Sequence, residues 1–122
     1  MKYVDGFVFV VPKRNLGAYR KMAQLAGRVW KKHGALEYFE CAGDDLNPNT
    51  GNMKATTFPK ITKLKKGESV WFSFIVYKSK SHRNNVNKKV MKYFEKDKDK
   101  NMKMPFDMKR MAYGGFKVIV EE

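Results

Sequence analysis

The fold is decided by residues 69–78, which run Ser-Val-Trp-Phe-Ser-Phe-Ile-Val-Tyr-Lys. Side chains of a strand alternate between two faces, so this stretch has one face of Val and Phe and a second that mixes aromatic residues with Ser. Residues 3–11, Tyr-Val-Asp-Gly-Phe-Val-Phe-Val-Val, divide in the same way. Both stretches therefore predict strands that are buried on their two faces.

Helices and further strands are predicted around these two. Apolar residues recur at helical spacing over residues 15–33, with Asn15 as a predicted N-cap and Gly34 just past the end. A second helix is expected to start at Ser79 or Ser81 and to end in the Lys and Asp run at 95–100. Shorter strands are predicted at 36–42 and 111–120, and a long loop at 43–68. The order βαββαβ predicts an α+β, ferredoxin-like plait: a four-stranded antiparallel sheet with two helices on one face.

Composition indicates one folded domain, residues 1–122. Apolar residues make up 43% of the chain, which is enough for one core and leaves no length for a second domain. The single cysteine cannot form an internal disulfide, and neither a secretory signal nor a membrane-spanning stretch is recognisable. We therefore expect a cytoplasmic protein with no membrane partner.

Two helices cover only one face of a four-stranded sheet, so the other face needs a polar surface or a cover. Neither face of the two long strands is polar. We assign the Val and Phe face to the helices and expect the mixed aromatic face to be open. An apolar face of roughly 400 Å² is large for a monomer, which predicts that two copies pair through their sheets as a homodimer.

The mixed face is also where we expect a ligand. Apolar walls with a few polar groups are typical of small-molecule sites, and this face offers Asp5, Trp71, Ser73 and Tyr77. The alternative is that Asp5 and Ser73 bond across the dimer interface. At the end of the second strand, Cys41, Asp44 and Asp45 are further candidate ligand-binding residues, although an Asx turn and a small buried thiol explain them equally simply.

The net charge of +14 indicates an affinity for anions. Arg20, Lys21 and Arg28, on the polar side of the first helix, form a candidate anion-binding surface. However, 21 of the 26 basic residues are Lys, which recognises phosphate less specifically than Arg does. The strand at 69–78 also lacks the basic-Gly-aromatic pattern of RNA-recognition motifs, so nucleic acid is the less favoured partner.

Motifs for metals and cofactors are missing from the sequence. One Cys and two distant His do not supply a metal ligand set, and no phosphate-binding glycine loop or nucleophile elbow is present. We therefore expect no metal and no cofactor, and catalytic residues remain unknown.

Several motifs resemble one family. The chain is similar to the bacterial YbaA-like proteins, domain of unknown function 1428, in six motifs that span nearly its whole length: residues 3–8, 40–45, 57–59, 72–77, 104–111 and 114–116. The resemblance implies a ferredoxin-like fold of the dimeric α/β-barrel kind and implies no activity. Asp107 and Arg110, in the fifth motif, complete the candidate ligand-binding residues. The chain departs from the family pattern at Ala42, where Trp is expected, and at Lys78, where Pro is expected, which leaves any shared pocket shape in doubt.

These observations favour a homodimer that binds a small molecule between its two sheets, with or without an enzymatic activity. The first alternative is a basic surface that binds nucleic acid or an acidic partner. The second is a cofactor-free monooxygenase, by analogy with other dimeric α/β barrels.

Overall fold

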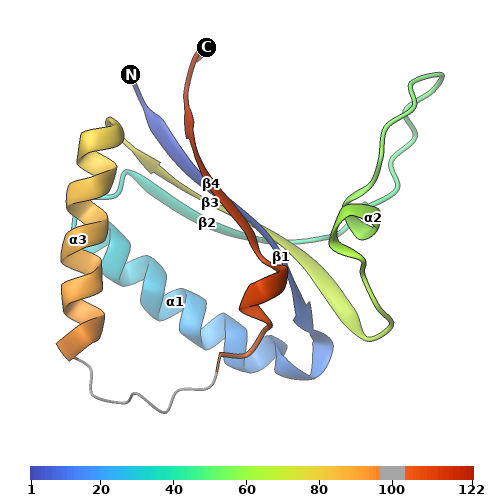
Figure 1. The fold of residues 1–122 in the computed structure, drawn as a ribbon, viewed down its shortest axis with the longest axis horizontal. Coiled ribbons are helices and arrows are strands. Elements are labelled where there is room, and N and C mark those ends of the chain that lie inside the picture. The colour runs from blue at the N-terminus through green and yellow to red at the C-terminus, as the bar shows by residue number, and fades with distance from the viewer. Residues whose placement is uncertain (97–103) are drawn as a thin grey trace.

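The protein is an α+β domain built on one four-stranded antiparallel sheet (Figure 1). The structure is a computed structural model that describes residues 1–96 and 104–122. Its elements are β1 (Tyr3–Pro12), α1 (Leu16–Lys32), β2 (Glu37–Ala42), α2 (Phe58–Thr62), β3 (Glu68–Tyr77), α3 (Lys80–Lys96) and β4 (Ala112–Lys117), with 3-10 turns at Lys13–Asn15 and Met108–Arg110.

The strands lie in the order β2-β3-β1-β4, and every neighbouring pair is antiparallel. The two long strands predicted from the sequence, β1 and β3, are the central pair, in a register that places Val8 opposite Phe72. The short strands β2 and β4 form the edges. The predicted four-stranded antiparallel sheet is therefore confirmed.

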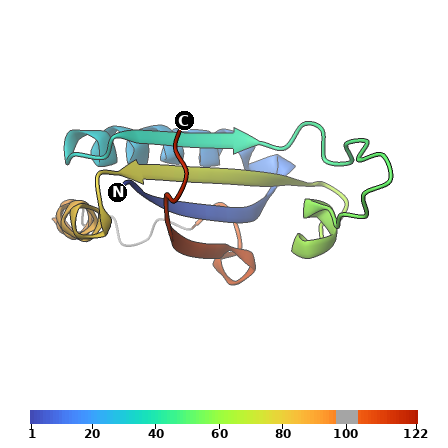
Figure 2. The ribbon, with the colours of Figure 1, turned by 90° about the horizontal axis from the view of Figure 1, so that it is seen from above.

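The long helices α1 and α3 lie on one side of this sheet (Figure 1). Figure 2 looks onto the sheet from the other side, with α1 behind the strands. On this uncovered side the short helix α2 contacts β1 and β3, close to the strand ends. We call this side of the sheet the open face; its residues are Val4, Gly6 and Val8 of β1, Glu37, Phe39 and Cys41 of β2, Phe72, Phe74 and Val76 of β3, and Ala112, Gly114 and Phe116 of β4. Val10 and Val70, farther along the same side, are buried.

The predicted assignment of the two faces is wrong. Asp5 is 1% exposed and Ser73 5% exposed, because the mixed aromatic face lies against the helices, whereas Phe72 on the opposite face is 44% exposed. The physical reason is that polar side chains of α3, among them Arg83, lie beside Asp5. An apolar open face is still left uncovered, and it is more uniformly hydrophobic than predicted.

The buried residues separate into two clusters on the helix side of the sheet. One contains Tyr77, Val86 and Val90 and lies between the sheet, α3 and the end of α1. The other contains Phe9 and Tyr19 and lies at the start of α1. Phe7 packs against both.

Helix ends follow simple capping chemistry, with one exception. Ser79 Oγ accepts a hydrogen bond from His82 N at 3.1 Å, as an N-cap does, and Gly34 has φ of +117° just past α1. Asn15 occupies the N-cap position of α1, as predicted, but its side chain makes no cap hydrogen bond; its Nδ2 instead donates to Pro105 O at 2.9 Å.

The helix α2 was expected to be loop. Thr57 caps it, because its Oγ1 accepts from Lys60 N, and Pro59 supplies a favourable first-turn residue. Before it, residues 43–57 form an extended arm that projects away from the sheet (Figure 1). Residues 97–100 of the predicted helix-ending run lie outside the described residues. No helix in the described part of the chain is both long and apolar enough to span a bilayer.

Candidate functional site

A chamber of about 350 Å³ separates the two core clusters. It lies between the sheet and α1, and the segment from Met104 to Met111 forms part of its wall. Its lining is aromatic and aliphatic except for Glu40, Ser73 and two tyrosine hydroxyls: Phe7, Phe9, Tyr19, Met22, Ala26, Trp30, Tyr38, Glu40, Ser73, Ile75, Phe94, Met104, Phe106, Met108 and Met111. A partly open hollow of this size, with mostly apolar walls and a few polar groups, is typical of small-molecule sites.

Glu40, on β2, is the only carboxylic acid among the described residues of this lining. Its Oε2 accepts a hydrogen bond from Tyr19 Oη at 2.7 Å, and its Oε1 accepts one from Tyr38 Oη at 2.8 Å. Burial, and then the neighbouring Glu40, raise the pKa of both tyrosines far above the usual range. Both hydroxyls therefore stay protonated and hold the carboxylate in place.

Gly27 of α1 makes room for this arrangement. A Cβ at position 27 would lie 2.9 Å from Cδ1 of Tyr38, which is closer than real contacts of that atom. The absence of a side chain lets the Tyr38 ring rest on the helix and point its hydroxyl at Glu40. Helix α1 and strand β2 thus position the carboxylate together.

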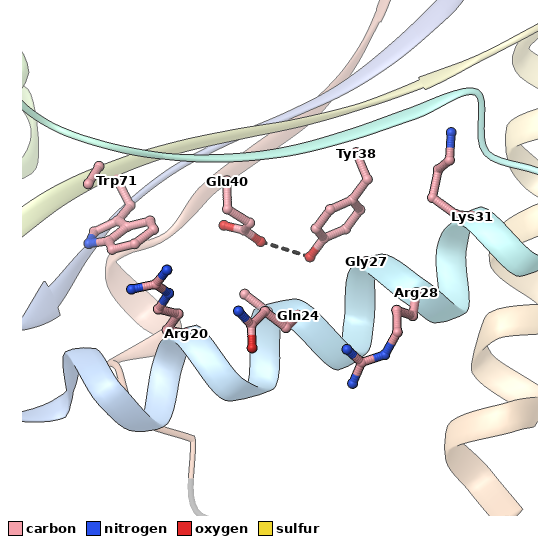
Figure 3. Close-up of a pocket in the computed structure, with 10 residues that line it drawn as sticks. Arg20, Gln24, Gly27, Arg28, Lys31, Tyr38, Glu40 and Trp71 are labelled. Carbon is pink, nitrogen blue, oxygen red and sulfur yellow. Dashed lines mark hydrogen bonds between the residues drawn. The ribbon is translucent and has the colours of Figure 1, made fainter.

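On its outer side Glu40 borders a second hollow, a trough of about 490 Å³ between α1 and the edge strand β2 (Figure 3). Arg20, Arg28 and Lys31 line it from α1, and Trp71 lines it from the sheet. The carboxylate therefore stands between an aromatic chamber on one side and a basic trough on the other.

Near the other end of the sheet, buried polar side chains form a network. Trp30 Nε1 donates to Tyr77 Oη at 3.1 Å and to Asn87 Oδ1 at 3.0 Å, and Tyr77 Oη donates to the same Asn87 oxygen at 3.1 Å. Burial, followed by the charge of Asp5, raises the pKa of Tyr77 far above its usual range. This network joins α1, β3 and α3, and its groups bond to one another.

The structure places the predicted ligand-binding residues in several different surroundings. Ser73 lines the chamber, and Trp71 lines the trough. Asp5 and Tyr77 are buried beyond the chamber, beside α3. Cys41 is exposed on the open face, so it lies on the opposite side of the sheet from Glu40.

The remaining predicted ligand-binding residues are away from both hollows. Asp44 and Asp45 are exposed at the start of the arm. Asp107 Oδ1 accepts from Lys109 N at 3.0 Å, as the cap of the 3-10 turn. Of the predicted anion-binding residues, Arg20 and Arg28 line the trough, whereas Lys21 does not.

Arg110 links three segments of the chain by hydrogen bonds. Its Nη2 donates to Glu68 Oε1 at 3.0 Å and to the carbonyl oxygens of Thr62 and Lys63 at 3.1 and 3.0 Å. It therefore ties the connection before β4 to the end of α2 and the start of β3.

Glu40 was missed as a site residue from the sequence, although it belongs to one of the family motifs. The available signal was the alternation of residues 36–42, which places Tyr38 and Glu40 on one face of the strand. Across residues 1–96 and 104–122, no three His, Cys, Asp or Glu side chains gather closely enough to hold a metal ion.

The fold and its hollows define a small α+β domain with an aromatic chamber inside and an apolar sheet face outside. The chain belongs to the family described as protein of unknown function (DUF1428), whose family model matches residues 2–108. It is 43% identical over 122 residues to the uncharacterized protein YbaA of Escherichia coli (strain K12), covering 100% of both chains. The uncharacterized protein YbaA of Shigella flexneri matches to the same extent. The family predicted from the motifs is confirmed, and neither relative carries an activity to transfer.

Proposed function

We propose that this protein is a homodimeric small-molecule-binding domain whose ligand occupies the chamber between the sheet and α1. The observation that carries the proposal is the division of the core into two clusters with a space of about 350 Å³ between them. The walls of this partly open hollow are mostly apolar, so a ligand that covered them would remove hydrophobic surface from water and stabilise the protein. The sequence analysis placed the ligand between the sheets of two subunits, whereas the chamber lies within one subunit.

A chamber-filling variant tests this proposal. Ala26 lies on the chamber wall, and Ala18, on the same helix, is exposed. We expect native mass spectrometry of the protein purified from cells to detect a bound small molecule that Ala26→Leu loses and Ala18→Leu keeps. We also expect Ala26→Leu to raise the melting temperature of the ligand-free protein, because the added side chain enters vacant space. Identical spectra for all three proteins, with no bound molecule, would count against the chamber as a site.

The proposed subunit is a ferredoxin-like plait, and the proposed dimer is an α/β barrel. The strand order β2-β3-β1-β4 and the succession of the long elements support the plait. The open face supports the dimer. Phe39, Phe72 and Phe116 on it are 45%, 44% and 63% exposed, and Glu37 is the one charged residue among those named for it.

Size also bears on the dimer. Four strands about 4.8 Å apart and about 20 Å long offer roughly 400 Å² in projection, whereas a stable interface buries about 800 Å² on each partner. Other exposed apolar groups must contribute the rest. Ile119 and Val120, each 76% exposed in the tail after β4, and the arm of residues 43–57 are available for this.

Sedimentation equilibrium at micromolar concentration tests the dimer. We expect a mass of twice 14.2 kDa for the protein and a single-subunit mass for Phe72→Glu, which places a charge at the centre of the open face. Met91→Glu is the matched control, because Met91 is 51% exposed on α3 at the helix side of the sheet. A single-subunit mass for the unaltered protein would exclude the dimer.

A second candidate function is the binding of a nucleic acid or acidic protein in the trough. The presence of Arg20, Arg28 and Lys31 along one wall favours it. We expect affinity for such a partner to fall steeply between 50 and 200 mM salt, and to fall further in Arg20→Ala/Arg28→Ala than in Lys88→Ala/Lys89→Ala on α3. Equal losses in both double variants would indicate a diffuse charge effect without a site.

A further inference from the structure

The ligand class can be inferred from the charge balance around Glu40. In the described residues the ion pairs of the acidic side chains are Asp5 with Arg83, Glu68 with Arg110 and Glu121 with Lys2. Glu40 is in none of them, in a protein whose formal charge is +14. Among the described residues its hydrogen bonds come from two neutral tyrosine hydroxyls, and the basic residues beside it, Arg20, Arg28 and Lys31, lie on the trough side and form no ion pair with it.

The carboxylate still has room to accept hydrogen bonds. Two carboxylate oxygens together accept about four, and Tyr19 and Tyr38 use one on each oxygen. Both tyrosines donate, so the free acceptor positions suit a hydrogen-bond donor on the ligand. A second carboxylate in the chamber would meet repulsion from Glu40, whereas a cationic donor gains both charge and hydrogen bonds.

The chamber walls favour the same charge. Tyr19 and Phe106 have ring centroids 5.6 Å apart on one side, and Trp30 and Phe94 have theirs 6.2 Å apart on the other. The faces of aromatic rings carry negative potential and attract ammonium groups, and such rings form the cages that bind organic ammonium ions. Glu40 is joined to both ring groups, through Tyr19 on one side and Tyr38 on the other.

We infer that the chamber binds a small organic cation, an amine with an apolar body, whose ammonium group pairs with Glu40 between the two groups of rings. This inference rests on the proposed function and adds the charge of the ligand to it. A volume of about 350 Å³ corresponds to roughly ten water molecules, so the ligand has about ten non-hydrogen atoms. An amine of that size is protonated at neutral pH and has one charged end, which matches the single carboxylate among the described residues of the lining.

Three probes of nearly equal shape test the charge: 2-phenylethylamine, 2-phenylethanol and phenylacetate. Their dissociation constants are measured by calorimetry or by NMR titration at pH 7 with the unaltered protein. We expect the amine to bind at least about tenfold more tightly than the alcohol, and phenylacetate to bind most weakly. Equal or tighter binding of the alcohol or of phenylacetate would overturn the inference.

Variants connect the preference to Glu40. Glu40→Gln keeps the shape of the side chain and should abolish the preference for the amine while alcohol binding persists. Tyr38→Phe removes one hydrogen-bond donor to Glu40 and keeps the carboxylate, so the preference for the amine should persist. This variant keeps the inference testable if the Glu40→Gln protein folds poorly. An amine preference that survives in a folded Glu40→Gln protein would assign the cation to another site.

The outcomes separate this inference from the proposed function. Binding of all three probes without charge preference, with all binding lost in Ala26→Leu, would support the chamber as a site and overturn its selectivity for cations. No binding of any probe at millimolar concentration would overturn the inference for ligands of this size. The co-purification experiment would then decide the proposed function on its own.

Discussion

Arg83 Nε lies 3.6 Å from Asp5 Oδ1 in the core between α3 and β1, and neither atom has a hydrogen-bond partner in the described part of the chain. The pair is held by its surroundings rather than by a bond of its own. Arg83 Nη2 donates to Tyr3 Oη at 3.1 Å, and its guanidinium lies 4.9 Å from the centre of the Tyr3 ring. Burial raises the pKa of Asp5 above its ordinary 3.8, and Arg83, Asn87, Tyr77 and Tyr113 act in the opposite direction.

This raised pKa predicts how stability depends on pH. The folded protein holds the Asp5 proton more tightly than the unfolded chain does, so the contribution of Asp5 is fully present below pH 3.8. It is lost as pH rises from 3.8 through the folded-state pKa. We expect the free energy of unfolding of the unaltered protein, minus that of Asp5→Asn, to fall over this window in urea titrations at a series of pH values.

Asp44→Asn is the matched control, because Asp44 is an exposed carboxylate in the arm. The same subtraction for Asp44→Asn should not show the fall. A difference for Asp5→Asn that stays flat, or that rises with pH, would contradict the raised pKa.

Gly115 of β4 provides the space for Tyr3 and Arg83. A Cβ at this position would lie 2.8 Å from Arg83 Nη2 and closer still to Tyr3 Oη. We expect Gly115→Ala to destabilise the protein by about 1–3 kcal/mol in chemical denaturation, since an added methyl in a packed site displaces its neighbours. Gly17→Ala in α1 is the control; nothing lies within 4 Å of its Cβ, so it should stabilise by about 0.5–1 kcal/mol. Equal effects of the two variants would show that the contact at Gly115 relaxes freely.

We expect Arg110 to limit local unfolding of the segment that contains α2. Its guanidinium donates hydrogen bonds to Glu68 and to the carbonyl oxygens of Thr62 and Lys63. The hydrogen bond from Arg110 is the main reason that the pKa of Glu68 is lowered. Arg110→Ala should speed amide hydrogen exchange in residues 58–68 by about tenfold or more, while β1 exchanges as before. Lys109→Ala, next in the sequence, should leave both segments unchanged. Faster exchange throughout the protein would indicate a general loss of stability instead.

The sequence was sufficient for the four strands and the two long helices but not for the side of the sheet that these helices cover. Period-two alternation divides β1 and β3 into two faces and says nothing about which face the helices cover. Polar residues at positions 5 and 73 favoured solvent on that face. Asp5 is buried beside Arg83 and Asn87, which are about 80 positions away in the chain, so no local pattern reveals its burial.

The chamber shows the same limit. Glu40 gains its role from Tyr19, 21 residues earlier on another element, and from a gap between two core clusters that exists only after folding. Residue spacing along β2 would have placed Tyr38 beside Glu40, but not the opposing rings. The helix α2 was missed because five residues are too few for a hydrophobic period to show, although Thr57 followed by Phe58 and Pro59 is a recognisable start signal.

Cys41 offers a chemical test of the dimer, because this single cysteine is exposed on the open face opposite Phe72 in the β2–β3 register. If two copies pair through their open faces, a thiol reagent should label Cys41 severalfold more slowly in the dimer than in Phe72→Glu. The rate for the unaltered protein should rise on dilution. The introduced carboxylate disfavours the thiolate, so faster labelling of Phe72→Glu cannot arise from a more reactive sulfur. Equal rates in the two proteins, at concentrations where sedimentation gives a dimer, would place the interface away from the open face.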